Sequence, residues 1–506
     1  MTQHFHCKFL ALAVATALLA SCANPHGLNP KNTLLDANAL QASQSLKNAH
    51  FSAANWPKSA WWRGFNDAQL NRMIDDAMAS SPDLQVVNAQ ADKANAQVIA
   101  ADAERYPDVG LNAGITRSRV AKVDDPLLEG KSYSTLRTAN VGLSYTFDLW
   151  GGKKDAAEAA LGQARASELD RQASQLTLAA NVTRAWNNLN LAWNNAELAQ
   201  QNAERAAGIA KIQQQYVSAG LTSDYQYKQA LSQQKTAQAE LTQAQQQVTD
   251  AGIQLSTLIG KGPDYWHQLK PAQMNVPVAA MLPNAIPAEL LGRRPDVVAA
   301  RWRVEAASKQ IAASKTEFYP NINLVAEAGT KSLLGDAFFG APSRFFNVGP
   351  SLSLPIFDAG KRRADLAESD ADYDLAVAQY NKLLISSLGN ISDTITQLQS
   401  IQDQLAQQES ANQLIHSAWD DLHREYAAGL RPYLDVLTIQ NQLIESDQKR
   451  VALKAQQINL AVVLIEDLGG GFQSSNSKFK KSPSMAALRR NVPILSAGIL
   501  PCIDES

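Results

Sequence analysis

The segment "TFDLWGGKKDA", residues 146–156, joins a strand-like pattern to a long stretch without proline. About 210 residues later the chain repeats the phrase as "IFDAGKRRAD", residues 356–365. In each copy, alternating apolar residues end at a glycine, and basic residues then open a helical pattern. The repetition predicts two equivalent junctions at which a strand ends and a helix begins.

Three other phrases also recur in the same order, with a nearly constant offset. They are "RYPDVGLNAG" (105–114) with "FYPNINLVAEAG" (318–329), "QQYVSAGLTSDY" (214–225) with "REYAAGLRPYLD" (424–435), and "STLIG" (256–260) with "IEDLGGG" (465–471). Such self-similarity predicts an internal tandem duplication. We expect a first repeat over residues 66–260, a proline-rich linker over 261–288 and a second repeat over 289–471.

The first residues have the pattern of a secretory signal. Lys8 precedes an apolar run, residues 9–20, which is too short to span a bilayer comfortably. A positive start, a short apolar run and a small-residue cleavage site predict a signal peptide over residues 1–21 that is removed from the mature protein.

A lipid anchor is predicted directly after this signal. "LASC", residues 19–22, resembles a bacterial lipobox, which implies that Cys22 is acylated and begins a lipid-anchored segment over residues 22–65. Ala23 follows it and implies, by resemblance to lipoprotein sorting rules, the outer membrane. An ordinary signal peptide with an incidental Cys22 is the alternative.

Each repeat carries two segments in which apolar residues alternate with small or polar ones, at residues 109–115, 140–150, 320–329 and 346–357. Alternation at period two predicts strands with two different faces, although Pro350 and Pro355 weaken the last one. The strands are about as long as the roughly 9–11 residues that a membrane-crossing strand requires. Two ordinary soluble hairpins would show the same pattern, so both interpretations stay open.

Each repeat also contains a very long segment that predicts a helix. Residues 153–216 and 361–426 hold no proline and almost no glycine, and each would extend on the order of 95–100 Å. A shorter helical pattern over 70–106 precedes the first strand, with a break expected at Pro82. The long helices are rich in small and amide side chains, which suits close side-by-side packing. A solid periplasmic coiled coil is the alternative interpretation.

Composition argues against most other functional classes. The chain has 46 basic and 48 acidic residues, so its net charge of −2 gives no global attraction to nucleic acid. Three cysteines in 506 residues exclude a disulfide framework. No HExxH, GxSxG or phosphate-loop motif is present, and His416 and His423 are predicted to be solvated helix residues. We therefore expect no enzyme activity, no cofactor and no metal site.

Four membrane strands in one chain would not be enough to close a barrel, because the smallest closed barrels have about eight. An open sheet edge in lipid leaves backbone groups without hydrogen bonds, so such a chain would have to form an oligomer. Three chains would supply twelve strands.

The duplicated phrases resemble those of a known family. The Tyr-Pro strand starts, the two "FD" junctions, "RRPDVVAARWRVEAA" (293–307) and the paired turns with Tyr and Gly are similar to those of the TolC-type outer membrane efflux factors. The resemblance covers about residues 56–471. With its lipobox, the chain is similar to the NodT-type outer-membrane lipoproteins of RND efflux systems.

This resemblance implies a mixed α+β membrane protein. It would be a homotrimer whose twelve-stranded outer-membrane β-barrel continues into a long α-helical barrel in the periplasm. It would act as a passive exit duct for small molecules, docked to a periplasmic adaptor and an inner-membrane RND pump. A duct for type I protein secretion and a coiled-coil scaffold without a pore are the alternatives. The exported substrates cannot be read from the sequence.

The two turns between the helices are the candidate site, with Tyr216, Gly220 and Leu221 at the first and Tyr426, Gly429 and Leu430 at the second. Glycines at such turns could simply cap helices. The resemblance implies that the turns contact the adaptor and form a closed periplasmic gate with Tyr426, Arg431 and Asp435, Asp224 being a weaker candidate. Three symmetry-related carboxylates would filter cations. Solvated surface charge is the alternative for Arg431 and Asp435.

The strand-to-helix junctions are the second set of candidate residues: Asp148, Gly151, Gly152, Asp358 and Gly360. Asp358 is placed to cap the helix that follows it. The basic run 361–363 opposes the helix dipole, so we expect it to face lipid headgroups or a neighbouring chain. Residues 472–506 depart from the duplication and are predicted to be a disordered tail.

Overall fold

The structure of this chain is a computed structural model, and it describes residues 25, 27–36, 57–119, 121, 123, 133–276, 292–333 and 337–473. The predicted signal peptide, Cys22, residues 277–288 of the predicted linker and the predicted tail beyond Gln473 lie outside these ranges. The chain divides into two units, Met1–Phe472 and Gln473–Ser506. Every helix and strand described below belongs to the first unit.

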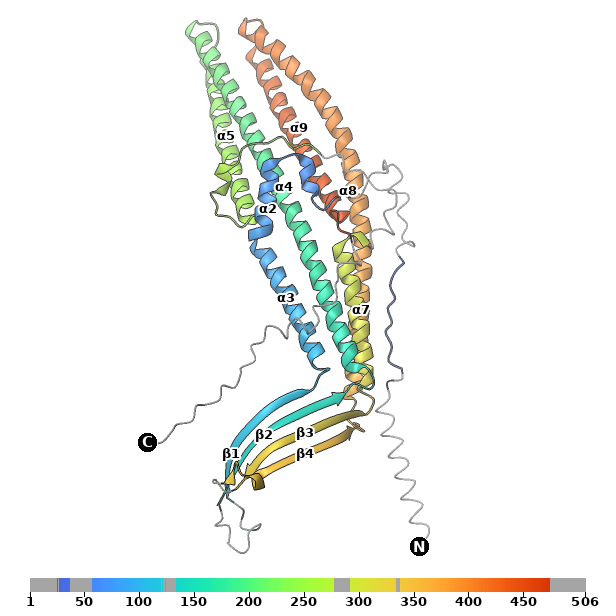
Figure 1. Cartoon of the computed structure of the whole chain (residues 1–506). Coiled ribbons are helices and arrows are strands. Elements are labelled where there is room, and N and C mark those ends of the chain that lie inside the picture. Colours follow the sequence, from blue (N-terminus) through green and yellow to red (C-terminus); the bar gives the residue numbers. More distant parts are fainter. Residues whose placement is uncertain are drawn as a thin grey trace, which may run out of the picture. The chain divides into compact units, whose positions relative to one another are not determined.

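Two pairs of long helices dominate this unit. Helices α4 (Gly152–Ser218) and α8 (Lys361–Ala427) each have 67 residues, and α5 (Asp224–Leu258) and α9 (Tyr433–Asp467) each have 35. At 1.5 Å per residue, α4 and α8 are each about 100 Å long. Helix α4 packs against α5, α8 packs against α9, and α4 also packs against α9 (Figure 1). The predicted long helices are therefore confirmed, with ends within two residues of those expected.

Shorter helices cover the strand-proximal half of α4. Helix α2 (Ala68–Ser80) and helix α3 (Pro82–Ala103) are separated by Ser81, which is extended, so the break expected at Pro82 is present. Helix α7 (Pro295–Thr316) packs against α4 and α8. The described residues also contain three short 3₁₀ helices: η2 (Trp61–Phe65), η3 (Tyr265–Gln268) and η6 (Ala341–Ser343).

The largest apolar core lies where η2, α2, α4, α5 and α9 meet. Its buried side chains include Leu70, Trp186, Leu255 and Ile465. The indole Nε1 of Trp186 donates to the carboxylate of Asp67 at 2.7 Å, and the same carboxylate accepts from the first backbone N–H groups of α2. One buried acid thus both begins α2 and holds it against α4.

Away from this core, small residues and amides join the long helices. A Cβ at Gly162 of α4 would lie 2.9 Å from the Cβ of Ala306 in α7, so the two helices are in very close contact there. Between α4 and α9, Asn187 donates to the carbonyl of Ala455 at 2.8 Å, and Gln440 donates to Asn202 at 2.9 Å. Directional hydrogen bonds therefore set the register between the two repeats at these positions.

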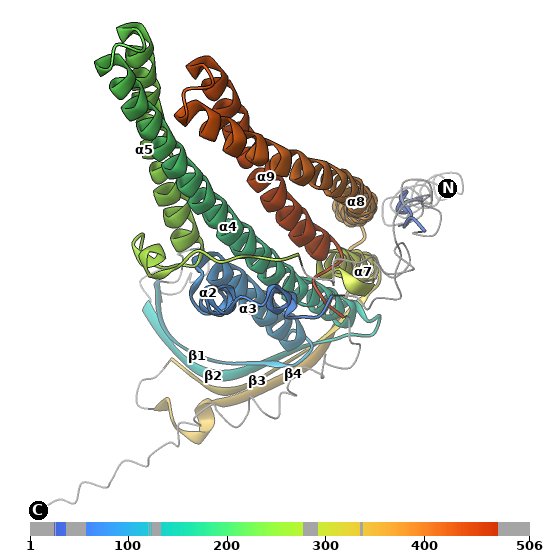
Figure 2. The same ribbon diagram turned by 90° about the horizontal axis from the view of Figure 1, so that it is seen from above.

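The four strands form one antiparallel sheet in the order β1-β2-β3-β4 (Figure 2). They are β1 (Asp108–Arg119), β2 (Tyr133–Phe147), β3 (Asn321–Ser332) and β4 (Arg344–Ser353). Strands of both repeats meet in the β2–β3 pair, and β1 and β4 each pair along one edge within the described residues. Strand β2 begins earlier than the expected residue 140 because it pairs with β1 over its whole length. Strand β4 ends before 357 because Pro355 has no N–H.

The sheet has one apolar face and one polar face. The register places Leu111, Val141, Ala328 and Phe346 in one row across the four strands, all on the same side. The next row, on the opposite side, is Gly110, Gly142, Glu327 and Asn347. Leu111 is 75 % exposed and Phe346 is 79 % exposed, so the apolar face is uncovered in the single chain. An uncovered apolar face of this kind marks a surface that contacts lipid or protein.

No helix among the described residues is long and apolar enough to cross a bilayer.

Candidate functional site

Helices α4 and α5 are joined by a turn that glycine makes possible. The N–H of Leu221 donates to the carbonyl of Tyr216 at 2.8 Å, and that of Gly220 donates to Val217 at 3.0 Å. Gly220 has φ of +68°, the left-handed conformation that ends a helix in the Schellman motif. No atom lies within 4 Å of the place that a Cβ would take. Backbone conformation, and not crowding, therefore requires glycine here.

The turn between α8 and α9 repeats this geometry. The N–H of Leu430 donates to the carbonyl of Glu425 at 2.9 Å, and that of Gly429 donates to Tyr426 at 2.9 Å. Gly429 has φ of +75°. Leu221 and Leu430 follow the two glycines, and each is 74 % exposed. Both turns lie at the end of the helices that is far from the sheet (Figure 1), so each hairpin presents an uncovered leucine there.

A pair of tyrosines joins the two hairpins beside these turns. The hydroxyl of Tyr216 donates to the backbone carbonyl of Tyr426 at 3.1 Å, and the two rings meet edge to face with centroids 6.1 Å apart. Tyr426 is only 1 % exposed, and its hydroxyl accepts from Gln213 at 2.8 Å. Burial raises the pKa of Tyr426 to about 12, so its phenol is neutral at ordinary pH. The ends of α4 and α8 are thus held together.

The charged candidates near the turns have different partners. Arg431 Nε donates to Glu425 at 2.7 Å across the second turn, and Glu425 raises the pKa of the Arg431 guanidinium more than Asp435 does. Asp224 pairs with Lys228 at 2.7 Å on the exposed surface. Asp224 and Asp435 lie in the first turns of α5 and α9, where a carboxylate interacts favourably with the helix dipole.

Sequence reasoning missed three of these partners. Gln213 donates to a buried phenol, Glu425 pairs with Arg431, and Lys228 pairs with Asp224. The Lys228 pair has helical i, i+4 spacing and could have been found. Gln213 lies in a glutamine-rich helix, where one buried amide has no distinguishing pattern.

His416 is exposed, as predicted for a solvated helix residue, whereas His423 is partly buried. His416 Nε2 lies 2.8 Å from Oδ1 of Asp447, a buried carboxylate that also accepts from Asn412 at 2.9 Å. His423 stacks on Trp419 with ring centroids 5.2 Å apart. His416 therefore links α8 to α9. Within the residues that the structure describes, no cluster of three potential metal ligands is found.

The two strand-to-helix junctions share an Asp followed by a left-handed glycine. Gly151 has φ of +80° and Gly360 has φ of +89°. The carboxylate of Asp148 accepts from the N–H groups of Lys153 and Lys154 at 3.1 and 2.9 Å. In both junctions the aspartate thus satisfies free N–H groups at the start of a 67-residue helix.

Asp358 does this at the second junction, and Arg362 corrects an expectation there. Asp358 accepts from the N–H groups of Gly360 and Arg362 at 3.1 and 3.3 Å. The Arg362 side chain also donates to the Asp358 carboxylate at 2.6 Å and to the Pro355 carbonyl at 2.8 Å. Arg362 is 5 % exposed. The expectation that the basic run faces headgroups or another chain is therefore wrong for Arg362.

The first junction also contacts α7 and the connection between α7 and β3 in the second repeat. Trp150 Nε1 donates to the carbonyl of Pro320 at 2.8 Å, and its ring stacks on Tyr319 at 4.9 Å between centroids. A Cβ at Gly152 would lie 2.0 Å from Oγ1 of Thr316. Gly152 is thus required by the close approach of α7, which makes its role different from that of Gly151.

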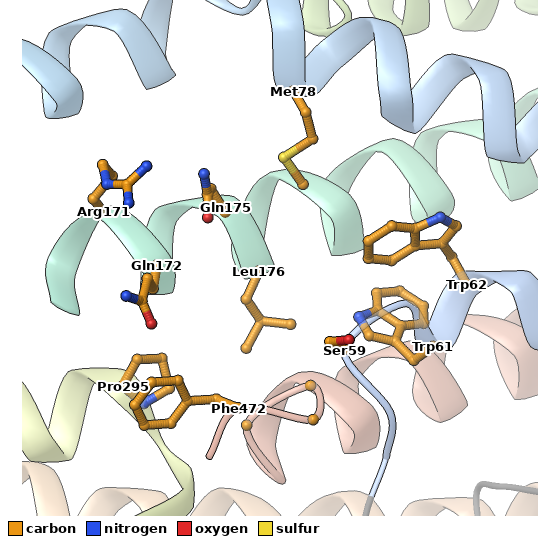
Figure 3. Close-up of a pocket in the computed structure, with 13 residues that line it drawn as sticks. Ser59, Trp61, Trp62, Met78, Arg171, Gln172, Gln175, Leu176, Pro295 and Phe472 are labelled. Atoms are coloured by element: carbon orange, nitrogen blue, oxygen red, sulfur yellow. The ribbon is translucent and has the colours of Figure 1, made fainter. Parts of the chain in front are cut away.

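A cavity of about 470 Å³ lies where the end of α9 meets η2 and α4 (Figure 3). Trp61, Leu176 and Phe472 line it, together with the loop Gly469–Gly471, whose three residues all have positive φ. The indole N–H of Trp61 is buried without a hydrogen-bond partner among the described residues. The guanidinium of Arg171, which also lines the cavity, is paired with Glu168.

This chain is similar in sequence and in structure to known outer-membrane proteins. The family model described as "Outer membrane efflux protein" matches residues 73–261 and 286–470. "Fusaric acid resistance protein FusA" of Burkholderia cepacia is 34 % identical over 368 residues, which cover 72 % of this chain and 69 % of that protein. "Probable outer membrane lipoprotein SilC" of Salmonella typhimurium is 27 % identical over 92 % of this chain and 99 % of its own. The crystal structure of the outer membrane protein VceC from Vibrio cholerae matches with a TM-score of 0.76 and 30 % identity, over 83 % of this chain and all of that chain.

Proposed function

Because the chain belongs to the outer membrane efflux protein family, we propose that three copies of it form one closed duct across the outer membrane. The chain itself is an outer-membrane exit duct for efflux. The observation that carries the trimer is the four-stranded sheet, with an uncovered apolar face and two open edges.

The two edges of the sheet need partners in a membrane. Strands β1 and β4 each pair along one side within the described residues, so each has a row of free backbone groups. In hydrocarbon, every unsatisfied backbone group costs several kcal/mol. Pairing β4 of one copy with β1 of the next removes all edges. Three copies then close a barrel of twelve strands, which is above the minimum of about eight.

The two faces of the sheet suit different surroundings. The row that contains Leu111 and Phe346 faces lipid, and the row that contains Gly110 and Glu327 faces the lumen. Glycine and small polar residues leave the lumen open to water. Below the barrel, three copies of α4, α5, α8 and α9 continue as a helical tunnel through the periplasm.

The far turns are the docking and gating end of this tunnel. Leu221 and Leu430 are exposed apolar side chains, which suits contact with a periplasmic adaptor that connects the tunnel to an inner-membrane RND pump. Three copies of Asp435 form the carboxylate ring of the gate, with Arg431 held beside it by Glu425. Energy comes from the pump, and the duct conducts passively.

The cargo is a small organic molecule. FusA is named for resistance to fusaric acid, and its similarity favours small-molecule efflux over protein secretion. A sheet that is apolar on one face and polar on the other favours a membrane barrel over a scaffold without a pore. SilC is named as a lipoprotein, which favours acylation of Cys22.

Conductance in planar lipid bilayers tests the duct. We expect discrete channels from the purified chain, with larger conductance from Asp435→Ala and Arg431→Ala because these weaken the closed tip. Asp250→Ala is the matched control, since Asp250 is an exposed acid on α5 far from the turn. No conductance from wild type or from either gate variant would contradict the proposal.

Radioactive palmitate tests the anchor separately. We expect label on the wild type and none on Cys22→Ser. Equal labelling of the two proteins would show that Cys22 is not the acylated residue.

A further inference from the structure

The apolar face of the sheet ends in a group of arginines at the end away from the long helices. Arg117 lies near the end of β1, Arg137 lies in the first half of β2, and Arg344 begins β4. The register puts all three on the same side as Leu111. We call these three residues the arginine rim.

The charge on this face has only one sign. The strands place 25 residues on the apolar side, and none of them is Asp or Glu. The acid nearest the middle of the sheet, Glu327, and the basic Lys331 lie on the opposite side. The rim is therefore a cationic band at one end of an otherwise apolar surface.

Arg117 and Arg137 are close to each other in spite of their like charge. Arg117 pairs with Thr135 and Arg137 pairs with Ile115, so the two arginines are diagonal neighbours at roughly 7–8 Å. Like charges repel each other at such a distance. The ring of Tyr133 lies 5.6 Å from the Arg117 guanidinium. This aromatic contact orients the guanidinium and leaves its positive charge in place.

The position of the rim identifies what neutralises it. Six residues separate Leu111 from Arg117 along β1, which is about 20 Å at 3.3–3.4 Å per residue. The helices continue from the opposite end of the sheet into the periplasm, so the rim lies at the outer surface of the membrane. There a lipid-facing side chain meets the headgroups of the outer leaflet.

We propose that the arginine rim binds the phosphate groups of lipid A in the outer leaflet. This inference rests on the proposed barrel, in which the apolar face is in contact with lipid. Arginine presents a planar fork of donors that binds phosphate in a bidentate way. Each copy of the chain supplies one rim, so a trimer holds lipid A at three equivalent places around its circumference.

Lipid binding by the full-length chain in detergent tests the proposal. The probes are bisphosphorylated lipid A and the same lipid after removal of its phosphates, with bound lipid counted by native mass spectrometry. We expect wild type to prefer the phosphorylated lipid by about tenfold or more. The triple variant Arg117→Gln, Arg137→Gln, Arg344→Gln should lose this preference, and the triple change to Lys should keep part of it.

Lys331→Gln is the matched control. It removes a positive charge at the same end of the sheet, but on the opposite face, so it should leave the preference unchanged. Channel conductance of each variant shows that it folds and inserts. Absence of a preference in wild type, or an equal loss in Lys331→Gln, would overturn the proposal. A wild type that prefers phosphorylated lipid A but never conducts would count against the duct and would still support the lipid site.

Discussion

The two turns at the far end of the helices have the same backbone and different side-chain surroundings. Each turn contains a glycine with positive φ and the same two backbone hydrogen bonds. The leucine after each glycine is exposed to the same degree. The tyrosines differ, because Tyr426 is buried and bonded to Gln213, whereas Tyr216 is partly buried and donates to the other repeat. Duplication thus preserved the shape of the turn, and the side chains around each copy diverged.

This difference assigns unequal parts to the two hairpins. Tyr426 at the end of α8 accepts two hydrogen bonds from α4, one at its hydroxyl from Gln213 and one at its backbone carbonyl from Tyr216. In the proposed gate, these contacts break when the two hairpins separate. Variants at equivalent positions of the two turns test whether the two hairpins are held alike.

The largest difference is expected between the two tyrosines. Tyr426→Ala removes a fully buried ring, and such truncations cost about 3–5 kcal/mol of unfolding free energy. Tyr216→Ala removes a partly exposed ring and should cost clearly less. Denaturant unfolding followed by circular dichroism measures both, and bilayer conductance should rise more for Tyr426→Ala. Equal effects would mean that the two hairpins are held alike.

The two turn glycines should respond alike. Gly220→Ala and Gly429→Ala each force an L-residue into the left-handed region, at a cost of about 1–2 kcal/mol. Gly208→Ala is the control, because Gly208 lies inside α4 with open space around it and alanine there should stabilise by up to about 1 kcal/mol. Thermal unfolding of the three variants checks this. A large inequality between Gly220 and Gly429 would show that the two turns are not equivalent in energy.

The two surface ion pairs should contribute little to the unfolding free energy. They should differ in their effect on channel conductance. Arg431 and Glu425 are about half exposed, and Lys228 and Asp224 more so, so solvent screens both pairs and breaking either should change the unfolding free energy very little. We expect Arg431→Ala to raise conductance and Lys228→Ala to leave it unchanged. A conductance change in Lys228→Ala as large as that in Arg431→Ala would place Asp224 in the gate.

The exposed leucines should have the smallest effect on stability. Leu221→Arg and Leu430→Arg lie on the surface and should change the unfolding free energy by no more than about 0.5 kcal/mol. Each should nevertheless weaken binding of a purified adaptor, because a charge replaces an apolar contact. If the variant that carries both changes binds the adaptor with normal affinity, these leucines are not part of the docking surface.

Much of the fold follows from local patterns. Absence of proline over more than 60 residues predicts the long helices, and alternation at period two predicts the strands with their two faces. The "FD" and glycine phrases predict where strands end and helices begin. In each case the decisive interactions join residues that are close in sequence, so a short window contains the information.

The features that the sequence did not predict depend on side-chain contacts, most of them between distant segments. Arg362 is predicted to be at the surface, but Asp358 and the Pro355 carbonyl, four and seven residues before it, bind its guanidinium inside the junction. His416 is held by Asp447 from the next helix, and Tyr426 by Gln213 from the other repeat. A polar residue in a helix has the same sequence signature whether its partner is water or a distant side chain.

The duplication, the lengths of the helices and the glycines of the turns follow from the amino-acid sequence, because helix and strand periods and positive φ are local requirements. That strands of both repeats join in one sheet through the β2–β3 pair is seen only in the folded chain. The fold also aligns the arginine rim on one face and brings Tyr216 against Tyr426. Strand register and buried hydrogen bonds between repeats arise only when segments about 200 residues apart come into contact.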